Sequence, residues 1–263
     1  MNLAYKYNET NTISLNFEDI YVGSLILVNY NHQLNNIAIE KNINLINLND
    51  EIKLEKTSIN NLLELVKVSK IQNKLAFVSG FRNYKEQREI YTNSLKGKGF
   101  EFTSKYVAFP NHSEHQTGLA IDIGEKRKFI DFIRPFLPYD GIFEKFRKNA
   151  SLYGFIERYK KNKTHITNIA AEPWHYRYVG FPHSHIIYEK DLCLEEYIEL
   201  IKNYKFNINP FVLKYKCFEI EISYLKYDSN NLEINTNNIP TTVSGNNIDG
   251  FIITQWRNCN GNL

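Results

Sequence analysis

The sequence is poor in cysteine, which excludes two kinds of covalently or metal-stabilised protein. Its three cysteines, Cys193, Cys217 and Cys259, are an odd number in 263 residues, and no two of them have CxxC spacing. This pattern argues against a disulfide framework and against a cysteine-ligated structural zinc cluster. We expect reduced thiols, which fit a cytoplasmic protein.

Long apolar runs are also missing. The run Leu25–Val28 is followed at once by the polar sequence NYN, whereas a membrane-spanning helix needs about 20 apolar residues. Residues 1–10 contain no basic segment followed by an apolar core, as a secretory signal would. We therefore expect no membrane span and a cytoplasmic location, or an extracytoplasmic one if the chain has been trimmed from a longer protein.

The chain has no strong charge of either sign. Its formal net charge is +3 at pH 7, and basic residues are interleaved with acidic ones. The densest basic clusters, at 126–128 and 160–163, are too short to indicate nucleic-acid binding and are typical of solvated loops. We expect no nucleic-acid partner.

The residues that are present describe a folded globular protein. Hydrophobic residues make up 43% of the chain and aromatic residues 14%, which argues against disorder. A chain of this length buries about 70–75% of its unfolded surface, enough for one large core or a core plus a small subdomain. From residue 214 onward the pattern changes to alternating apolar residues typical of strands. We divide the chain into a main domain over 1–205 and a β-rich C-terminal extension over 206–263.

Hydrophobic periodicity predicts an α+β fold, with a small central, mainly antiparallel sheet flanked by helices. We expect helices over 58–72, 83–95, 126–134, 141–153 and 192–204, and strands over 75–78 and 119–123. The second helix should end at Gly97 and Gly99, and the third at Pro135. In the extension a turn is expected at 244–247.

Two short segments concentrate chemically active side chains. Residues 113–122 read SEHQTGLAID, and residues 172–175 read EPWH. Together they supply the imidazoles of His115 and His175, a ligand carboxylate in Asp122 and a spare carboxylate in Glu172. Catalytic zinc sites use such a set: three protein ligands, a fourth position open for water, and a general base beside it.

Neighbouring residues indicate how the two segments could meet. Residues 117–118 are a turn signal, and the apolar run 119–123 is typical of a short buried strand. Pro173 disfavours a helix interior, so the second segment is not a helical HExxH motif and is predicted to be a strand or strand edge. The HxxxxxxD spacing alone is weak, because an Asp near a His is more often a hydrogen-bond partner. The metal-site interpretation is stronger for the two segments together, because one supplies a histidine and an aspartate and the other supplies the second histidine and the general base.

These motifs resemble those of the zinc D-alanyl-D-alanine peptidases of the VanX, VanY and VanXY type. Other similar segments are SGFRNYKEQ at 79–87, IRP at 133–135, EPWHYRYVG at 172–180 and SGNNIDGF at 244–251, the last similar to the tail of a VanXY-type protein. The resemblance extends from about Tyr21 to Trp256. It implies one zinc ion per chain, held by His115, Asp122 and His175, with Glu172 as general base.

The resemblance also gives roles to four residues that position alone would not single out. Arg82 matches the family's oxyanion-stabilising arginine, a role suited to a side chain that keeps its charge; otherwise a surface arginine would be the simpler interpretation. Gln87, Ser113 and Tyr159 match positions that bind the substrate's C-terminal carboxylate through neutral donors. Without the resemblance they would be interpreted as a surface amide, a cap and a core phenol. Trp174 is interpreted as a wall of the site or as core packing, and the other histidines as structural or solvated.

The implied reaction is hydrolysis of D-Ala-D-Ala peptide bonds, with D-Ala-D-Ala and peptidoglycan precursor peptides as partners. The sequence EHQT at 114–117 resembles the corresponding segment of VanY-like and VanXY-like enzymes, and no export signal is seen. We therefore expect a bifunctional D,D-dipeptidase and D,D-carboxypeptidase of cell-wall metabolism and glycopeptide resistance. Alternatives are a VanY-like carboxypeptidase only, a peptidoglycan endopeptidase, and a catalytically silent zinc-containing wall-binding module. The carboxylate-binding residues count against the endopeptidase, and Glu172 with Arg82 against the silent module. The extension is expected to be structural or to contact a second subunit.

Overall fold

The computed structural model describes residues 11–228 and 232–258. Within these residues the chain divides into two compact units. The larger unit comprises 28–33 and 43–195, and the smaller unit comprises 11–27, 34–42 and the described residues from 196 onward. Helices and antiparallel sheets occur together, which confirms the predicted α+β class. The predicted boundary between a catalytic domain over 1–205 and an extension over 206–263 stays a prediction.

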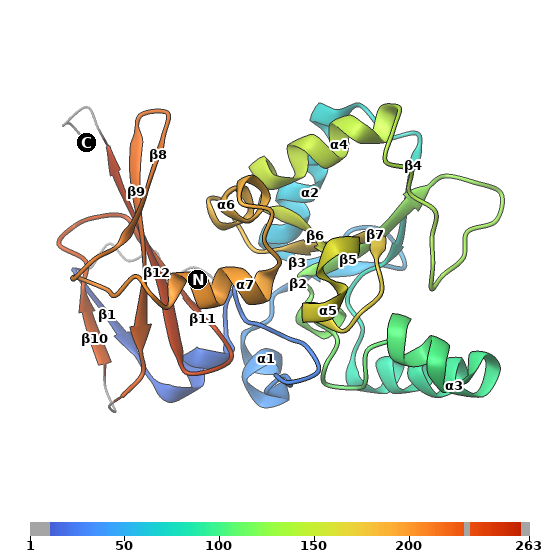
Figure 1. Ribbon diagram of the computed structural model, residues 1–263, viewed down its shortest axis with the longest axis horizontal. Coiled ribbons are helices and arrows are strands. Elements are labelled where there is room, and N and C mark those ends of the chain that lie inside the picture. The colour runs from blue at the N-terminus through green and yellow to red at the C-terminus, as the bar shows by residue number, and fades with distance from the viewer. Residues whose placement is uncertain (1–10, 229–231, 259–263) are drawn as a thin grey trace. The chain divides into compact units, whose positions relative to one another are not determined.

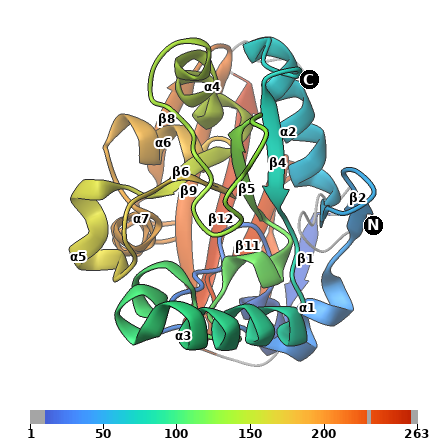
Figure 2. The same cartoon turned by 90° about the vertical axis from the view of Figure 1, so that its right-hand side faces the viewer.

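The larger unit is built on a four-stranded antiparallel sheet with the strand order β4-β5-β7-β6 (Figures 1 and 2). Its strands are β4 (Leu75–Ser79), β5 (Ala120–Glu125), β7 (Glu172–Tyr178) and β6 (Phe155–Tyr159). The two central strands, β5 and β7, are buried along nearly their whole length. A second, two-stranded ribbon pairs β2 (Leu45–Asn47) with β3 (Lys53–Glu55).

The longer helices of the larger unit lie at its two opposite ends. Helix α2 (Lys56–Ser69) packs against α4 (Ile142–Ala150), and α3 (Tyr84–Tyr106) lies at the other end in both views (Figures 1 and 2). The apolar face of α2 is buried, and its N-terminus is capped by Glu55, whose carboxylate accepts from two backbone N–H groups. The shorter elements are η2 (Glu114–Thr117), η3 (Ser151–Tyr153), η4 (Lys161–Lys163), α5 (Thr164–Thr167) and α6 (His183–Glu189).

One predicted helix is absent, and another is followed by a further helical segment. No helix forms over 126–134, where the chain makes a loop between β5 and α4. In that loop the Asp131 carboxylate accepts from the backbone N–H groups of Ile133 and Arg134, a local bond that competes with helix formation. Helix α3 spans Tyr84–Tyr106, but Gly99 has non-helical backbone angles, with φ 79° and ψ 174°, so two helical segments meet there. The predicted end of the first segment is confirmed at Gly99, whereas the second segment, which continues to Tyr106, was not predicted.

The smaller unit contains a second four-stranded antiparallel sheet, with the order β11-β12-β9-β8. Its strands are β11 (Thr241–Gly245), β12 (Gly250–Asn258), β9 (Phe218–Lys226) and β8 (Phe211–Tyr215), and β1 (Thr12–Leu15) pairs with β10 (Leu232–Asn235). The remaining elements are η1 (Phe17–Tyr21), α1 (Asn36–Asn42) and α7 (Leu194–Ile201), which begins in the larger unit. The predicted turn at 244–247 starts later, because residues 244–245 still belong to β11 and Asn246 Oδ1 holds the turn that follows.

The structure also bears on disulfide bonds and on membrane-spanning helices. Within the described residues Cys193 and Cys217 form no disulfide, and Cys259 lies outside the described residues. Over the described ranges, none of the helices combines the length and the apolar character that crossing a bilayer requires.

Candidate active site

Strand pairing in the larger unit brings the two predicted motifs together. Asp122 on β5 lies directly opposite His175 on β7, so their side chains share one face of the sheet. Asp122 Oδ1 is 3.0 Å from His175 Nδ1. His115 approaches from η2, and its Nε2 lies 3.1 Å from Asp122 Oδ2. Each carboxylate oxygen of Asp122 therefore faces a different imidazole.

The turn that carries His115 is held in place on both sides. His115 Nδ1 is 2.7 Å from the carbonyl oxygen of Gly80; because a carbonyl only accepts, Nδ1 carries the proton and Nε2 is left with its lone pair. Gly118 ends the turn with a φ of 68°, and a Cβ at this position would lie 2.8 Å from Leu45 Cδ2. Only glycine fits that backbone without strain.

The three residues fit a zinc ion by donor type and spacing. His115, Asp122 and His175 are buried, and their candidate ligand atoms all lie within 4.8 Å of one another. Two ligands of a tetrahedral zinc are separated by about 3.3–3.6 Å, given Zn–N and Zn–O bonds of about 2.0–2.2 Å. The observed separations, 3.0 Å from Asp122 Oδ1 to His175 Nδ1 and 3.1 Å from Asp122 Oδ2 to His115 Nε2, are slightly shorter, so a small outward movement of the three side chains would admit the ion.

The local electrostatic environment keeps His115 and Asp122 in the protonation states that bind a metal, a neutral imidazole and an ionised carboxylate. Burial and the Arg82 charge lower the pKa of His115 to about 4, which keeps its imidazole neutral. Burial alone would raise the pKa of Asp122, but His115 and His175 hold it well below its usual value, so it is ionised. Burial also disfavours charge on His175, yet Asp122 and Glu114 raise its pKa to about 9. Metal binding at His175 would therefore release a proton.

Glu172 begins β7, three residues before His175. Its Oε2 lies 3.9 Å from His175 Nδ1, and its side chain is buried. Burial raises the pKa of Glu172 to about 8, and the nearby Asp122 carboxylate adds to the rise, against the opposing effects of His175 and Arg82. The second segment is thus a strand, as predicted, and it places a carboxylate beside the three candidate ligands without making it one of them.

Arg82 follows β4 and turns into the same site. Its backbone N–H donates to the His115 carbonyl at 3.2 Å, and its Nη2 lies 3.7 Å from Asp122 Oδ2. Burial lowers the pKa of Arg82, while Asp122 and Glu172 oppose that shift. Among the described residues its Nε has no hydrogen-bond partner, although it is buried. An unsatisfied guanidinium N–H at this position is available to a ligand.

One pocket collects every residue that the sequence singled out for the site. It is lined by the three candidate metal ligands, by Glu172 and Arg82, and by Gln87, Ser113 and Tyr159. Trp174 also lines the pocket, the first of the two interpretations given for it. Ser113 occupies the N-cap position of η2, but its hydroxyl makes no capping bond. Gln87 donates from Nε2 to the Ala108 carbonyl at 2.7 Å, and its buried Oε1 has no partner within the described chain.

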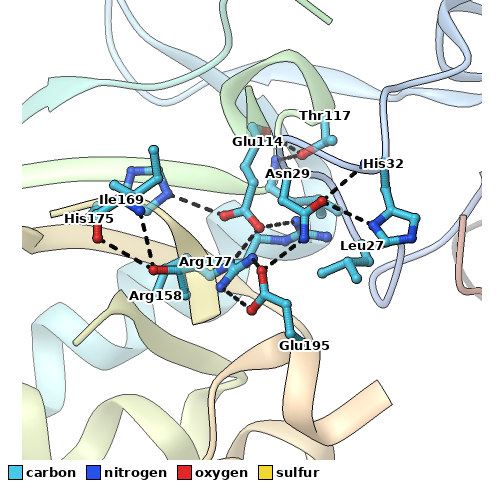
Figure 3. Close-up of polar contacts among 12 residues, drawn as sticks. Leu27, Asn29, His32, Glu114, Thr117, Arg158, Ile169, His175, Arg177 and Glu195 are labelled. Carbon is cyan, nitrogen blue, oxygen red and sulfur yellow. Dashed lines mark hydrogen bonds and ion pairs between the residues drawn. The ribbon is translucent and has the colours of Figure 1, made fainter. Parts of the chain in front are cut away.

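Glu114 is the main residue that the sequence reading missed. Figure 3 shows it between His175 on one side and Arg158 and Arg177 on the other. Arg158 Nε and Arg177 Nη1 donate to Glu114 Oε1 at 2.8 and 2.9 Å, and Glu114 Oε2 lies 3.3 Å from His175 Nε2. A signal existed in the sequence, because both arginines interrupt buried strands and a buried charge needs a partner.

Comparison with known proteins identifies the family. The chain matches the family described as VanY: D-alanyl-D-alanine carboxypeptidase over residues 51–181, a range that contains all eight predicted site residues. It is 38% identical over 178 residues to the bifunctional D-Ala-D-Ala dipeptidase and D-Ala-D-Ala carboxypeptidase VanXYC of Enterococcus gallinarum. That match covers 67% of this chain and 94% of the relative.

Two solved structures are similar. The crystal structure of the vancomycin resistance D,D-dipeptidase VanXYg with a phosphinate analogue of D-Ala-D-Ala superposes with a TM-score of 0.88, at 45% identity, covering 94% of this chain and 98% of that one. A variant of the D,D-pentapeptidase VanY from a VanB-type resistance cassette, in complex with Zn(II), has a TM-score of 0.57 at 31% identity, covering 66% of this chain and 98% of that one. The resemblance read from the motifs is confirmed, and the chain belongs to the VanY family of D-alanyl-D-alanine peptidases.

Proposed function

We propose that this chain is a zinc D,D-peptidase of the VanXY type, which hydrolyses the free dipeptide D-Ala-D-Ala and removes the terminal D-Ala from peptidoglycan precursor peptides. The observation that carries the proposal is the buried cluster of His115, Asp122 and His175 with Glu172 and Arg82 in the same pocket. The similarity to VanXYC, described as both dipeptidase and carboxypeptidase, supports the double activity. Such an enzyme lowers the supply of precursors ending in D-Ala-D-Ala, as glycopeptide resistance requires.

The proposed metal is one zinc ion per chain. His115 would bind it through Nε2, Asp122 through a carboxylate oxygen and His175 through Nδ1, the nitrogen that faces Asp122. When bound at such a site, zinc supplies a Lewis acid and lowers the pKa of water from near 16 to about 7. The zinc-bound VanY variant supports this choice of metal.

Two residues of the chain would move and stabilise charge. In its ionised form Glu172 would take a proton from the attacking water and deliver it to the leaving amine, because its carboxylate lies beside the ligand cluster without belonging to it. Arg82 would donate to the carbonyl oxygen as negative charge develops there, using the N–H group that is free of partners in the described structure. Neither role requires a residue outside the pocket.

Gln87, Ser113 and Tyr159 would bind the substrate's terminal carboxylate. All three line the pocket. The Ser113 hydroxyl is not used as a cap, and burial raises the pKa of Tyr159 well above its usual value, so its hydroxyl keeps its proton and can donate. Neutral donors hold a carboxylate without competing for the metal as ligands. We also propose that the protein is cytoplasmic and that its catalytic domain ends near residue 205.

The deciding experiment measures D-alanine release from D-Ala-D-Ala and from a muramyl pentapeptide, each with and without a zinc chelator. We expect chelator-sensitive release from both substrates. Release from the pentapeptide alone would replace the proposal with a VanY-like carboxypeptidase. Release from neither substrate, by protein shown to contain zinc, would overturn the peptidase assignment in favour of another bond or a silent wall-binding module.

A further inference from the structure

Glu114 is a buried carboxylate next to the proposed zinc site, and it has no part in the reaction described above. It precedes His115 in η2, and its side chain is completely buried. Its two oxygens have different partners. Oε1 accepts from Arg158 and Arg177, whereas Oε2 faces His175 Nε2 at 3.3 Å (Figure 3).

The charge of Glu114 is balanced away from the metal side. Arg158 and Arg177 are both fully buried. Arg158 also donates through both terminal nitrogens to Glu195, at 2.8 and 2.7 Å, and Glu195 accepts from Asn29 at 3.0 Å. Two carboxylates and two guanidinium groups thus neutralise one another. Because the arginines occupy Oε1, Oε2 is the oxygen left to meet the imidazole.

The two nitrogens of His175 face different carboxylates. Nδ1 faces Asp122, and His115 reaches the same carboxylate, so Nδ1 is the nitrogen directed into the proposed ligand cluster. Nε2 faces Glu114 on the opposite side of the ring. An imidazole that binds a metal through Nδ1 must carry its proton on Nε2, and a buried N–H needs an acceptor.

We propose that Glu114 is a positioning residue for the metal: it accepts the Nε2–H of His175 and holds the imidazole in the tautomer that presents Nδ1 to zinc. The inference rests on the proposed zinc site. Carboxylates that accept the second N–H of a metal-binding histidine fix the ring and raise its basicity, and their loss typically costs 10–100-fold in metal affinity. His115 is fixed in the corresponding way by the Gly80 carbonyl, so both imidazoles have an acceptor behind them.

A competing interpretation is that Glu114 only neutralises the two buried arginines. The variant Glu114→Gln distinguishes the positioning role from the neutralising role, because it keeps the size of the side chain and replaces one carboxylate oxygen with an NH2 group. The arginines can only donate, so they will hold the amide oxygen of the new side chain at the Oε1 position. The amide NH2 then faces His175 Nε2 and requires a lone pair there. That reverses the hydrogen bond and shifts the His175 proton to Nδ1, where it blocks metal binding.

The matched control is Glu195→Gln. Glu195 accepts from Arg158 and Asn29 within the same network, and neither of its oxygens faces His175 in these bonds. Each variant removes one charge from the network, so each should lower the urea midpoint of the metal-free protein. A role limited to neutralising arginines predicts the same effect on zinc binding for both.

The experiment measures zinc dissociation constants of the full-length wild type and both variants by competition with a chromogenic chelator. Nitrogen NMR of the zinc-loaded protein reports which nitrogen of His175 is protonated. We expect Glu114→Gln to weaken zinc binding 10–100-fold, Glu195→Gln to change it less than about 2-fold, and the wild type to show a protonated Nε2.

The outcomes separate this inference from the function on which it depends. Equal zinc affinity in wild type and Glu114→Gln, or equal losses in the two variants, would overturn the positioning role alone. A wild-type imidazole protonated at Nδ1 in the zinc-loaded state would do the same. A wild-type protein that binds no zinc would overturn the proposed metal site, and the role of Glu114 with it.

Discussion

Asp122 and His175 are direct partners across the β5–β7 ladder, and Asp122 uses its second oxygen to face His115. The site therefore depends on strand register. Successive residues of a strand point to opposite faces, so a slip of one residue would turn either side chain away from the other. This arrangement makes the central carboxylate the residue that joins the two motifs.

Replacing Asp122 with Asn should remove the metal while leaving the strand in place. The amide has the same shape, but it lacks the negative charge that a zinc ligand provides. We expect zinc content after dialysis to fall from about one equivalent to a small fraction of it, measured by elemental analysis, with an unchanged circular dichroism spectrum. A folded variant that retains stoichiometric zinc would remove Asp122 from the proposed ligands.

Glu172→Gln should separate catalysis from metal binding. The variant cannot accept a proton at this position, so kcat for D-Ala-D-Ala should fall by about 10²–10⁴-fold, with zinc content and KM nearly unchanged. The control is Glu157→Gln on β6, since Glu157 is paired with Arg147 and does not line the pocket. That variant should keep its kcat. Near-normal turnover by Glu172→Gln would exclude Glu172 as the general base.

Arg82 should act on the transition state more than on substrate binding. Loss of a preorganised oxyanion donor typically costs about 10²–10³-fold in kcat, and we expect that range for Arg82→Ala. Arg82→Lys keeps the charge but not the rigid fork of donors, so its loss should be smaller. Steady-state kinetics with D-Ala-D-Ala will measure both constants. A rise in KM at constant kcat would instead assign Arg82 to ground-state binding.

The sequence predicts the chemistry of the site better than the loops around it. His115 and Asp122 flank a turn signal and an apolar run, and Pro173 excludes a helix, so local rules alone favoured a turn and two strands as carriers of the motifs. The family and the α+β class were confirmed. The roles of the individual site residues stay predictions.

What the sequence could not show depends on long-range contacts and on side chains that compete with the backbone. The pattern over 126–134 is compatible with a helix, but Asp131 bonds the local backbone and a loop results. Glu114 meets Arg158 and Arg177 only because η2, β6 and β7 come together in the fold. No spacing along the chain reports that meeting.

A last prediction concerns stability in acid and lies outside the proposed site. His183 on α6 is buried, and burial lowers its pKa from 6.5 to about 3. Between these two pH values the unfolded chain binds a proton that the folded chain excludes, so the unfolded state gains as the pH falls. This histidine should therefore reduce the free energy of unfolding by up to about 1.4 kcal/mol for each pH unit below 6.5.

The test compares urea unfolding of the wild type and His183→Gln at pH 7 and pH 5. Carboxylates elsewhere contribute equally to both proteins, so the difference isolates His183. We expect the wild type to lose about 1–2 kcal/mol more than the variant between the two pH values. His165→Gln, which changes an exposed histidine, is the control and should behave like the wild type. Parallel losses in wild type and His183→Gln would show that His183 becomes protonated in the folded state, despite its burial, as readily as in the unfolded chain.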